Sequence, residues 1–170
     1  MNVYIPLADG QHVPEVVLNT IKNQIVDCHI YQFATPGIGN SQGVYNNVRK
    51  QGECRSRNLI MNKATDVFVM IDRDIVLLSK TVIHDMLHYI VDNTLCGACA
   101  VKMSTRHHIT IQCVMIRPIS IEGFRFDPES KTCTCNQLHN HINNIGLSMD
   151  FYTDEITGHE IVIDTNNKID

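Results

Sequence analysis

The strongest constraint on the fold is a short apolar run that ends in two carboxylates. Residues 67–71 are apolar and rich in β-branched side chains, and Asp72-Arg73-Asp74 follows them directly. A continuous apolar run of this length predicts a strand buried on both faces, as in the middle of a parallel sheet. Open α/β sheets bind their ligands beyond the carboxyl ends of such strands. The run therefore predicts an α/β fold with a binding site close to the two aspartates.

The spacing of Asp72 and Asp74 suits a divalent cation. Alternate residues of an extended chain share a face and lie roughly 6–7 Å apart, so both carboxylates can point to one place. There they would suffer desolvation and mutual repulsion, which a cation would relieve. Hard oxygen ligands suit Mg²⁺ or Mn²⁺, whose coordination a substrate phosphate would complete. The alternative is a polar turn after a strand, with Arg73 screening the two charges.

The composition indicates one soluble globular domain over residues 1–170. Hydrophobic residues make up 44% and charged residues 19% of the chain, and the formal net charge is −4, so broad nucleic-acid binding is not indicated. No apolar run is long enough for a transmembrane segment, and the first residues lack a signal-peptide pattern. Seven cysteines without a secretory signal predict reduced thiols and a cytoplasmic protein.

The order of the predicted elements indicates an α/β domain with a mainly parallel central sheet flanked by helices, a Rossmann-like arrangement. Apolar spacing predicts helices over 14–26, 53–64 and 133–145, and another that begins at Ser79. Predicted strands cover 2–6, 28–33, 66–71, 94–103, 109–116, 148–152 and 159–163. The 34–47 segment, rich in Gly, Pro, Asn and Ser, is predicted to be a long functional loop.

Two arginines fall in the first turn of the predicted 53–64 helix. Cations such as Arg55 and Arg57 oppose the helix dipole there, unless an anion lies at that end of the helix. One interpretation is that an anionic ligand binds near the start of this helix. The other is that both arginine side chains are solvated.

Four groups of residues follow one another in a characteristic order. The groups are Val3-Tyr4-Ile5-Pro6 before a helix, Gly52-x-x-Arg55-x-Arg57-Asn58 followed by Ala64-Thr65-Asp66, Ile71-Asp72-Arg73-Asp74, and a closing set. The closing set contains Gly123-Phe124-Arg125-Phe126-Asp127, Cys135-Asn136-Gln137-Leu138, Ile145-Gly146-Leu147 and His159. In their order and spacing these groups resemble glycosyltransferases of the GT-A fold, most closely the large family 2, and the match covers nearly the whole chain.

The resemblance implies a metal-dependent transfer of a sugar from a UDP- or GDP-sugar to a hydroxyl of a glycan or another acceptor. It implies Mn²⁺ or Mg²⁺ as the cofactor, held by Asp72, Asp74 and His159. The donor-binding residues that it implies are Pro6, Ala8, Asp9, Arg57, Asp72 and Arg73. A fixed cation would stabilise the charge that develops on the departing diphosphate.

The sequence departs from the family pattern at the catalytic base. The family has a Glu-Asp pair at the start of its late helix, where this chain has Thr134 and Cys135, and a thiol is a poor replacement. The base candidates are therefore Cys135 itself and nearby carboxylates, or the base is missing. The carboxylates are Asp127, Glu129, Asp154 and Glu155. The end of the second strand also lacks the acidic residue that the family places near uracil.

Two other functions are consistent with the residues. One is a nucleotide-sugar-binding domain that lacks the base and does not catalyse transfer. The other is a zinc-thiol module, whose ligands would be Cys133, Cys135, His139 and His141, with Cys96 and Cys99 as further candidates. The histidine pairs 84/88 and 107/108 are interpreted as surface residues.

Overall fold

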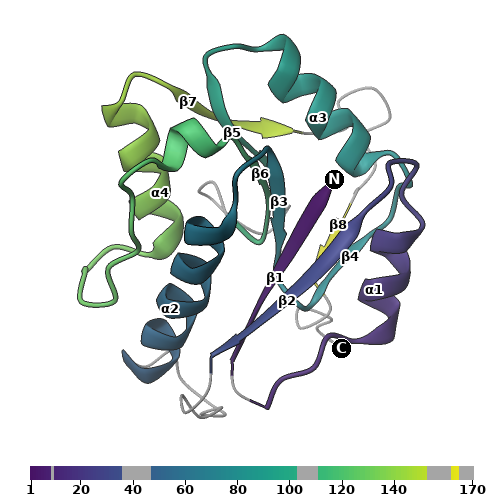
Figure 1. Cartoon of the computed structure of the whole chain (residues 1–170), viewed down its shortest axis with the longest axis horizontal. Coiled ribbons are helices and arrows are strands. Elements are labelled where there is room, and N and C mark those ends of the chain that lie inside the picture. Colours follow the sequence, from purple (N-terminus) through teal and green to yellow (C-terminus); the bar gives the residue numbers. More distant parts are fainter. Residues whose placement is uncertain (9, 36–46, 103–110, 153–161, 165–170) are drawn as a thin grey trace.

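A six-stranded mixed sheet forms the centre of the protein (Figure 1). In spatial order its strands are β2 (His29–Thr35), β1 (Asn2–Ala8), β3 (Phe68–Ile71), β6 (Cys113–Ile116), β5 (Cys96–Val101) and β7 (Ser148–Tyr152). The computed structural model describes residues 1–8, 10–35, 47–102, 111–152 and 162–164, and the structural statements below concern these residues.

Most strand pairs in this sheet are parallel. β1 pairs in parallel with both β2 and β3, and β5 pairs in parallel with β7. β6 runs antiparallel to β3 on one side and to β5 on the other. The prediction of a mainly parallel sheet is confirmed, with one reversed strand near its centre. Two short strands, β4 (Ile75–Leu77) and β8 (Val162–Asp164), form a separate antiparallel pair.

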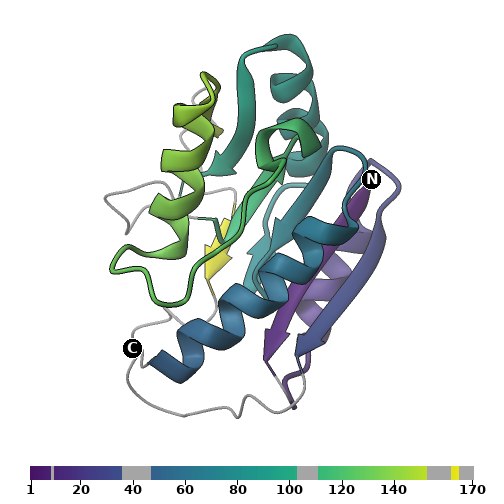
Figure 2. The same ribbon diagram turned by 60° about the vertical axis from the view of Figure 1, so that its left-hand side comes forward.

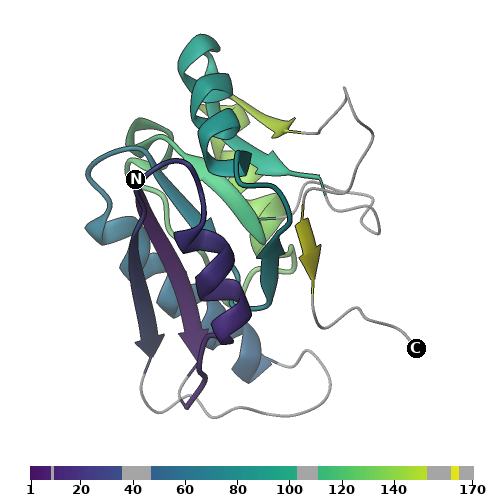
Figure 3. The same cartoon turned by 90° about the vertical axis from the view of Figure 1, so that its right-hand side faces the viewer.

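Helices cover both faces of the sheet. α2 (Asn47–Lys63) and α4 (Thr134–Asn144) lie on one face (Figure 2), and α1 (Glu15–Lys22) and α3 (Val82–Asp92) lie on the other (Figure 3). A short 3₁₀ helix, η1 (Pro118–Ile121), follows β6. None of the described helices combines the length and the apolarity needed to cross a membrane.

β3 supplies side chains to both cores. Val69 and Ile71 belong to the cluster under α1 and α3, whereas Phe68 and Met70 belong to the cluster under α2 and α4. All four side chains are fully buried. Because successive strand residues point to opposite faces, a strand in the middle of a two-sided core must be apolar throughout. The prediction from the apolar run is therefore confirmed.

Several predicted boundaries differ from the structure. α2 begins at Asn47 rather than at residue 53, so Arg55 and Arg57 lie well inside the helix and the prediction of a first-turn position is wrong. The first turns of α2 are polar in sequence, so they carry no apolar spacing to reveal them. β4 was not predicted, and β8 pairs with it rather than with the main sheet. Residues 36–46 of the predicted loop lie outside the described residues.

The predicted end of the last helix is confirmed. α4 ends at Asn144, and Gly146 follows with a φ of 81°, a conformation that costs glycine little. The N–H groups of Gly146 and Leu147 donate to the carbonyls of Asn143 and Ile142, which satisfies two carbonyls at the helix end. The chain then turns directly into β7.

Gly97 in β5 provides a test of the packing beneath η1. A Cβ atom at this position would lie 2.9 Å from Ser120 Cβ and 3.2 Å from Ile142 Cγ2. We expect Gly97→Ala to lower the free energy of unfolding by about 1–3 kcal/mol, as overpacking does in other cores. Urea unfolding checks this against Asn140→Ala on the exposed side of α4. Equal stability of the two variants would contradict the close packing described here.

Candidate functional site

The Asp72-Arg73-Asp74 segment forms a tight turn at the carboxyl end of β3. The Asp72 N–H donates to the carbonyl of Gln112 at 2.7 Å, and the Ile75 N–H donates to the carbonyl of Asp72 at 3.1 Å. The second of these hydrogen bonds closes a turn from Asp72 to Ile75, so the segment is not extended chain. β4 begins immediately after it. The two carboxylates still interact, since the charge of Asp74 contributes to the raised pKa of Asp72.

A buried arginine from α2 neutralises Asp72. Arg57 is only 5% exposed, and its Nη2 donates to Asp72 Oδ1 at 3.1 Å and to Oδ2 at 3.4 Å. Its Nη1 donates to Thr134 Oγ1 at 2.8 Å and to Glu53 Oε2 at 3.4 Å. The guanidinium therefore joins α2, the end of β3 and the start of α4. The alternative from the sequence is that Arg73 screens the charges of the two aspartates. For Asp72, the arginine that does so is Arg57.

Three carboxylates carry charge at this site. Burial raises the pKa of Asp72 to about 6, with Arg57 acting in the opposite direction and Asp74 and Glu53 adding to the increase. Burial also acts to lower the pKa of Arg57, but Asp72 and Glu53 outweigh it and the pKa is raised. Arg57 thus pairs with Asp72 and Glu53, while Asp74 acts on Asp72 as a third carboxylate.

One polar atom at the centre of the site has no partner. Arg57 Nε is buried and makes no hydrogen bond to any described residue. A buried N–H without an acceptor costs about 1–3 kcal/mol, so such groups call for an explanation. A ligand oxygen would satisfy it.

The start of α4 borders the same site. Thr134 is buried and accepts the hydrogen bond from Arg57, and Cys135 lies close enough to Arg57 and Asp72 to interact electrostatically with both. Burial raises the pKa of the Cys135 thiol, whereas a hydrogen bond with the backbone of Ile111 and the charge of Arg57 lower it; burial prevails. At neutral pH the side chain is therefore a protonated thiol.

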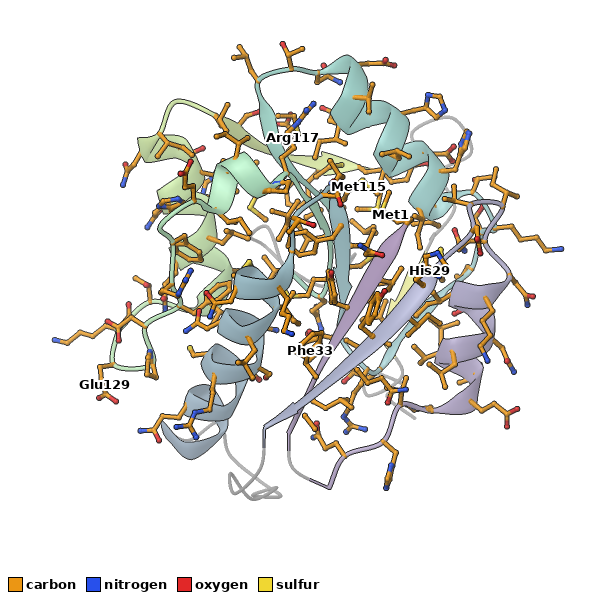
Figure 4. All side chains as sticks on the ribbon, viewed as in Figure 1. Met1, His29, Phe33, Met115, Arg117 and Glu129 are labelled. Carbon is orange, nitrogen blue, oxygen red and sulfur yellow. The ribbon has the colours of Figure 1, made fainter. Side chains whose placement is uncertain are left out.

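The other predicted site residues are spread over several elements. Pro6 and Ala8 lie in β1, and Arg73 and Asp74 are partly exposed in the turn after β3. Asp127 and Glu129 are exposed in the loop before α4, and Figure 4 shows Glu129 pointing away from the protein. The predicted residues that lie outside the described part of the chain are Asp9, Asp154, Glu155 and His159.

The cysteines and histidines proposed for zinc do not come together. Cys96 and Cys99 are buried in β5, where burial raises the pKa of both thiols. Cys133 accepts a hydrogen bond from the Asn136 N–H at the start of α4, and the ring of His141 packs against Phe124. Within the described ranges, no group of three or more His, Cys, Asp or Glu residues is arranged to hold a metal ion.

An open pocket that the sequence did not predict lies beside a neighbouring face of α2. Its volume is about 510 Å³, and it lies between the helix and the loop that precedes α4. The lining residues are Gln51, Cys54, Arg55, Asn58, Leu59, Asn62 and Pro128. Asn58 fixes that loop, because its side chain donates to the carbonyl of Phe126 and accepts from the N–H of the same residue.

The architecture is a GT-A-like fold, as the sequence resemblance predicted. A mannosyltransferase from Pyrobaculum calidifontis in complex with GDP-Man and Mn²⁺ matches with a TM-score of 0.68 over 90% of this chain and 54% of its own, at 11% identity. S. aureus TarS in complex with UDP-GlcNAc matches with a TM-score of 0.63 over 91% of this chain and 56% of its own, at 12% identity.

A third match extends the same likeness. Drosophila β1,4-galactosyltransferase 7 in complex with manganese, UDP-Gal and xylobiose has a TM-score of 0.60, over 98% of this chain and 70% of its own, at 14% identity. No protein-family model matches this sequence, and no curated protein matches it. The likeness is one of fold, and this chain spans little more than half the length of the first two structures.

The ion pair can be tested by a double-mutant cycle. We expect Arg57→Met to lower the free energy of unfolding by about 1–3 kcal/mol, because it leaves Asp72 partly buried without a counter-charge. Adding Asp72→Asn should recover part of the loss, giving a coupling energy of about 0.5–3 kcal/mol in urea unfolding. Arg55→Met, an exposed position in the same helix, is the control. A coupling energy near zero would contradict the pairing.

The raised pKa of Asp72 predicts a particular pH dependence. Its pKa rises from the usual 3.8 to about 6 on folding, so the folded protein binds this proton more tightly than the unfolded chain does. The stabilisation is present below the unfolded pKa and is lost as pH rises through the folded one. We expect the stability of the wild type to fall relative to Asp72→Asn between pH 4 and pH 6. An increase over that range would show that Arg57 dominates instead.

Proposed function

We propose that this protein is a metal-dependent glycosyltransferase that moves a sugar from a nucleotide-diphosphate sugar to an acceptor hydroxyl. The observation that carries the proposal is the pair Asp72 and Asp74 beside the buried Arg57, at the end of β3 in a GT-A-like fold. In open α/β sheets this edge is where ligands bind.

The carboxylates fit a hard divalent cation. Asp72 and Asp74 would hold Mn²⁺ or Mg²⁺ together with oxygens of the donor diphosphate, and His159 is the proposed third ligand. Burial raises the pKa of Asp72 to about 6, the charges of Asp74 and Glu53 add to the increase, and this cost of ionisation supports the assignment. When bound, such an ion neutralises charge on a departing diphosphate. Of the similar structures, the mannosyltransferase is a complex with GDP-Man and Mn²⁺, and the galactosyltransferase is a complex with manganese and UDP-Gal.

Arg57 is the proposed link between the metal ligands and the donor. Its contacts to Asp72 and Thr134 hold the planar guanidinium in one orientation. The Nε–H, which lacks a partner among the described residues, is the donor that a phosphate or ribose oxygen would accept. Pro6, Ala8 and Asp9 at the end of β1, with Arg73, complete the proposed nucleotide site.

The candidates for the catalytic base lie around the start of α4. Asp127 and Glu129 carry carboxylates on the loop before α4, and Cys135 lies beside Arg57. A general base must reach the acceptor hydroxyl and be deprotonated near neutral pH. The raised pKa of Cys135 argues against the thiol in that role, so we assign the base to the 127–129 loop.

A second candidate function is a binding domain that does not transfer the sugar. Thr134 and Cys135 occupy the helix start where the resembling family carries acidic residues, and the pKa of Cys135 is raised. Such a protein would keep the donor site and lack turnover.

As for localisation, no disulfide joins the seven cysteines, all of which are described, and we propose a reducing, cytoplasmic setting.

Calorimetry with nucleotide sugars tests the donor site. We expect UDP- or GDP-sugars to bind with Mn²⁺ and to bind weakly without it. Asp74→Ala should lower the metal-dependent affinity at least tenfold while the protein remains folded by circular dichroism, because it removes one of the two carboxylates that would hold the cation. Asp66→Ala, an exposed carboxylate that precedes the same strand, is the matched control.

The possible outcomes separate the two candidates. No binding of any nucleotide sugar, with or without Mn²⁺, would exclude both. Donor hydrolysis or transfer to a glycan acceptor would identify an enzyme. Tight donor binding without turnover in the presence of acceptors would favour the binding domain.

A further inference from the structure

The exposed side of α3 carries two histidines one helical turn apart. The ring centroids of His84 and His88 are 4.4 Å apart, with an angle of 51° between the ring planes. The side chain of His84 is 39% exposed, and His88 is exposed. Residues i and i+4 of a helix project from the same face, so both imidazoles can reach one point in solvent.

A carboxylate orients the first of these rings. His84 Nδ1 lies 2.9 Å from Asp85 Oδ1, and Tyr152 in β7 donates from its hydroxyl to Asp85 Oδ2 at 3.1 Å. When Nδ1 carries the proton toward the carboxylate, Nε2 keeps its lone pair and faces away from Asp85. Histidines that bind metals almost always donate their other ring N–H to a carboxylate or carbonyl in this way.

The carboxylate of Asp85 supports His84 as a ligand. A carboxylate that accepts the other ring N–H makes an imidazole a stronger ligand. Because Tyr152 belongs to the edge strand β7, the sheet itself holds this carboxylate in place.

We propose that His84 and His88 form a binding site for a divalent transition-metal ion of the zinc type. Imidazole nitrogen suits Zn²⁺, Ni²⁺ and Cu²⁺, whereas Mg²⁺ and Mn²⁺ favour oxygen ligands. The site is therefore chemically distinct from the carboxylates at the end of β3, and it does not depend on the function proposed above.

Among the described residues the site has two protein ligands, since no group of three or more His, Cys, Asp or Glu residues there is arranged to hold a metal ion. The His spacing equals that of helical zinc motifs with a carboxylate after the first histidine. Here Asp85 is bonded to His84 itself, so it supports the ligand and is not placed to activate a metal-bound water.

The experiment titrates the full chain with ZnCl₂ and, separately, with NiCl₂ in calorimetry. We expect one equivalent to bind the wild type and raise its melting temperature, because the ion binds the folded helix and not the unfolded chain. His84→Ala and His88→Ala should each abolish this binding. Asp85→Asn should weaken it roughly tenfold, the usual effect of losing a carboxylate behind a ligand.

Control variants exclude other histidines. His139→Ala removes a histidine from α4 whose ring is hydrogen bonded to Asn143, and the double variant His107→Ala/His108→Ala removes the other histidine pair. Both should bind Zn²⁺ as the wild type does. Because His88 is exposed, His88→Ala is expected to fold normally, which circular dichroism checks.

Three results would overturn the proposal. These are no binding of Zn²⁺ or Ni²⁺ by the wild type, unchanged binding in a folded His88→Ala variant, and loss of binding in the His107→Ala/His108→Ala or His139→Ala controls. None of these results bears on nucleotide-sugar binding, so this proposal and the proposed function fail or stand separately.

Discussion

The buried guanidinium of Arg57 is the constraint around which the end of β3 is arranged. A charge removed from water is tolerated only when it is paired and hydrogen bonded. Arg57 meets this condition through Asp72 and Thr134, which come from two other elements of the fold. The pair therefore sets the position of α2 relative to the sheet and to α4, and it places the carboxylates at the edge where a ligand would bind. The unpaired Nε is the one part of this arrangement that the described residues leave unsatisfied.

The sheet explains why these groups meet at one edge. β1, β2 and β3 are parallel, so their carboxyl ends lie together at one edge of the sheet, and Asp72 and Asp74 follow β3 there. The reversed strand β6 lies between β3 and β5, and its neighbour Gln112 accepts the hydrogen bond that holds the Asp72 backbone.

Two kinds of ligand atom lie in different regions of the molecule. The carboxylate oxygens of Asp72 and Asp74 lie beyond β3, next to the guanidinium of Arg57. The imidazole nitrogens of His84 and His88 lie on the outer face of α3. Hard and borderline metal ions discriminate between such sites by ligand chemistry rather than by affinity alone. Cys135 borders the first region, whereas the cysteines in β5 and β6 are buried among apolar side chains and behave as small core residues.

The sequence by itself determined the fold class, the buried central strand and the position of the two aspartates after it. Each of these follows from local patterns: apolar runs, helical spacing and the residues that end them. The tertiary structure alone decided that Arg57 rather than Arg73 neutralises Asp72, and that α2 begins six residues before its apolar spacing does. It also decided the pairing of β4 with β8 and the support of His84 by Tyr152 through Asp85. The physical reason is that ion pairs and short strands depend on contacts between residues far apart in the chain, whose register no local pattern records.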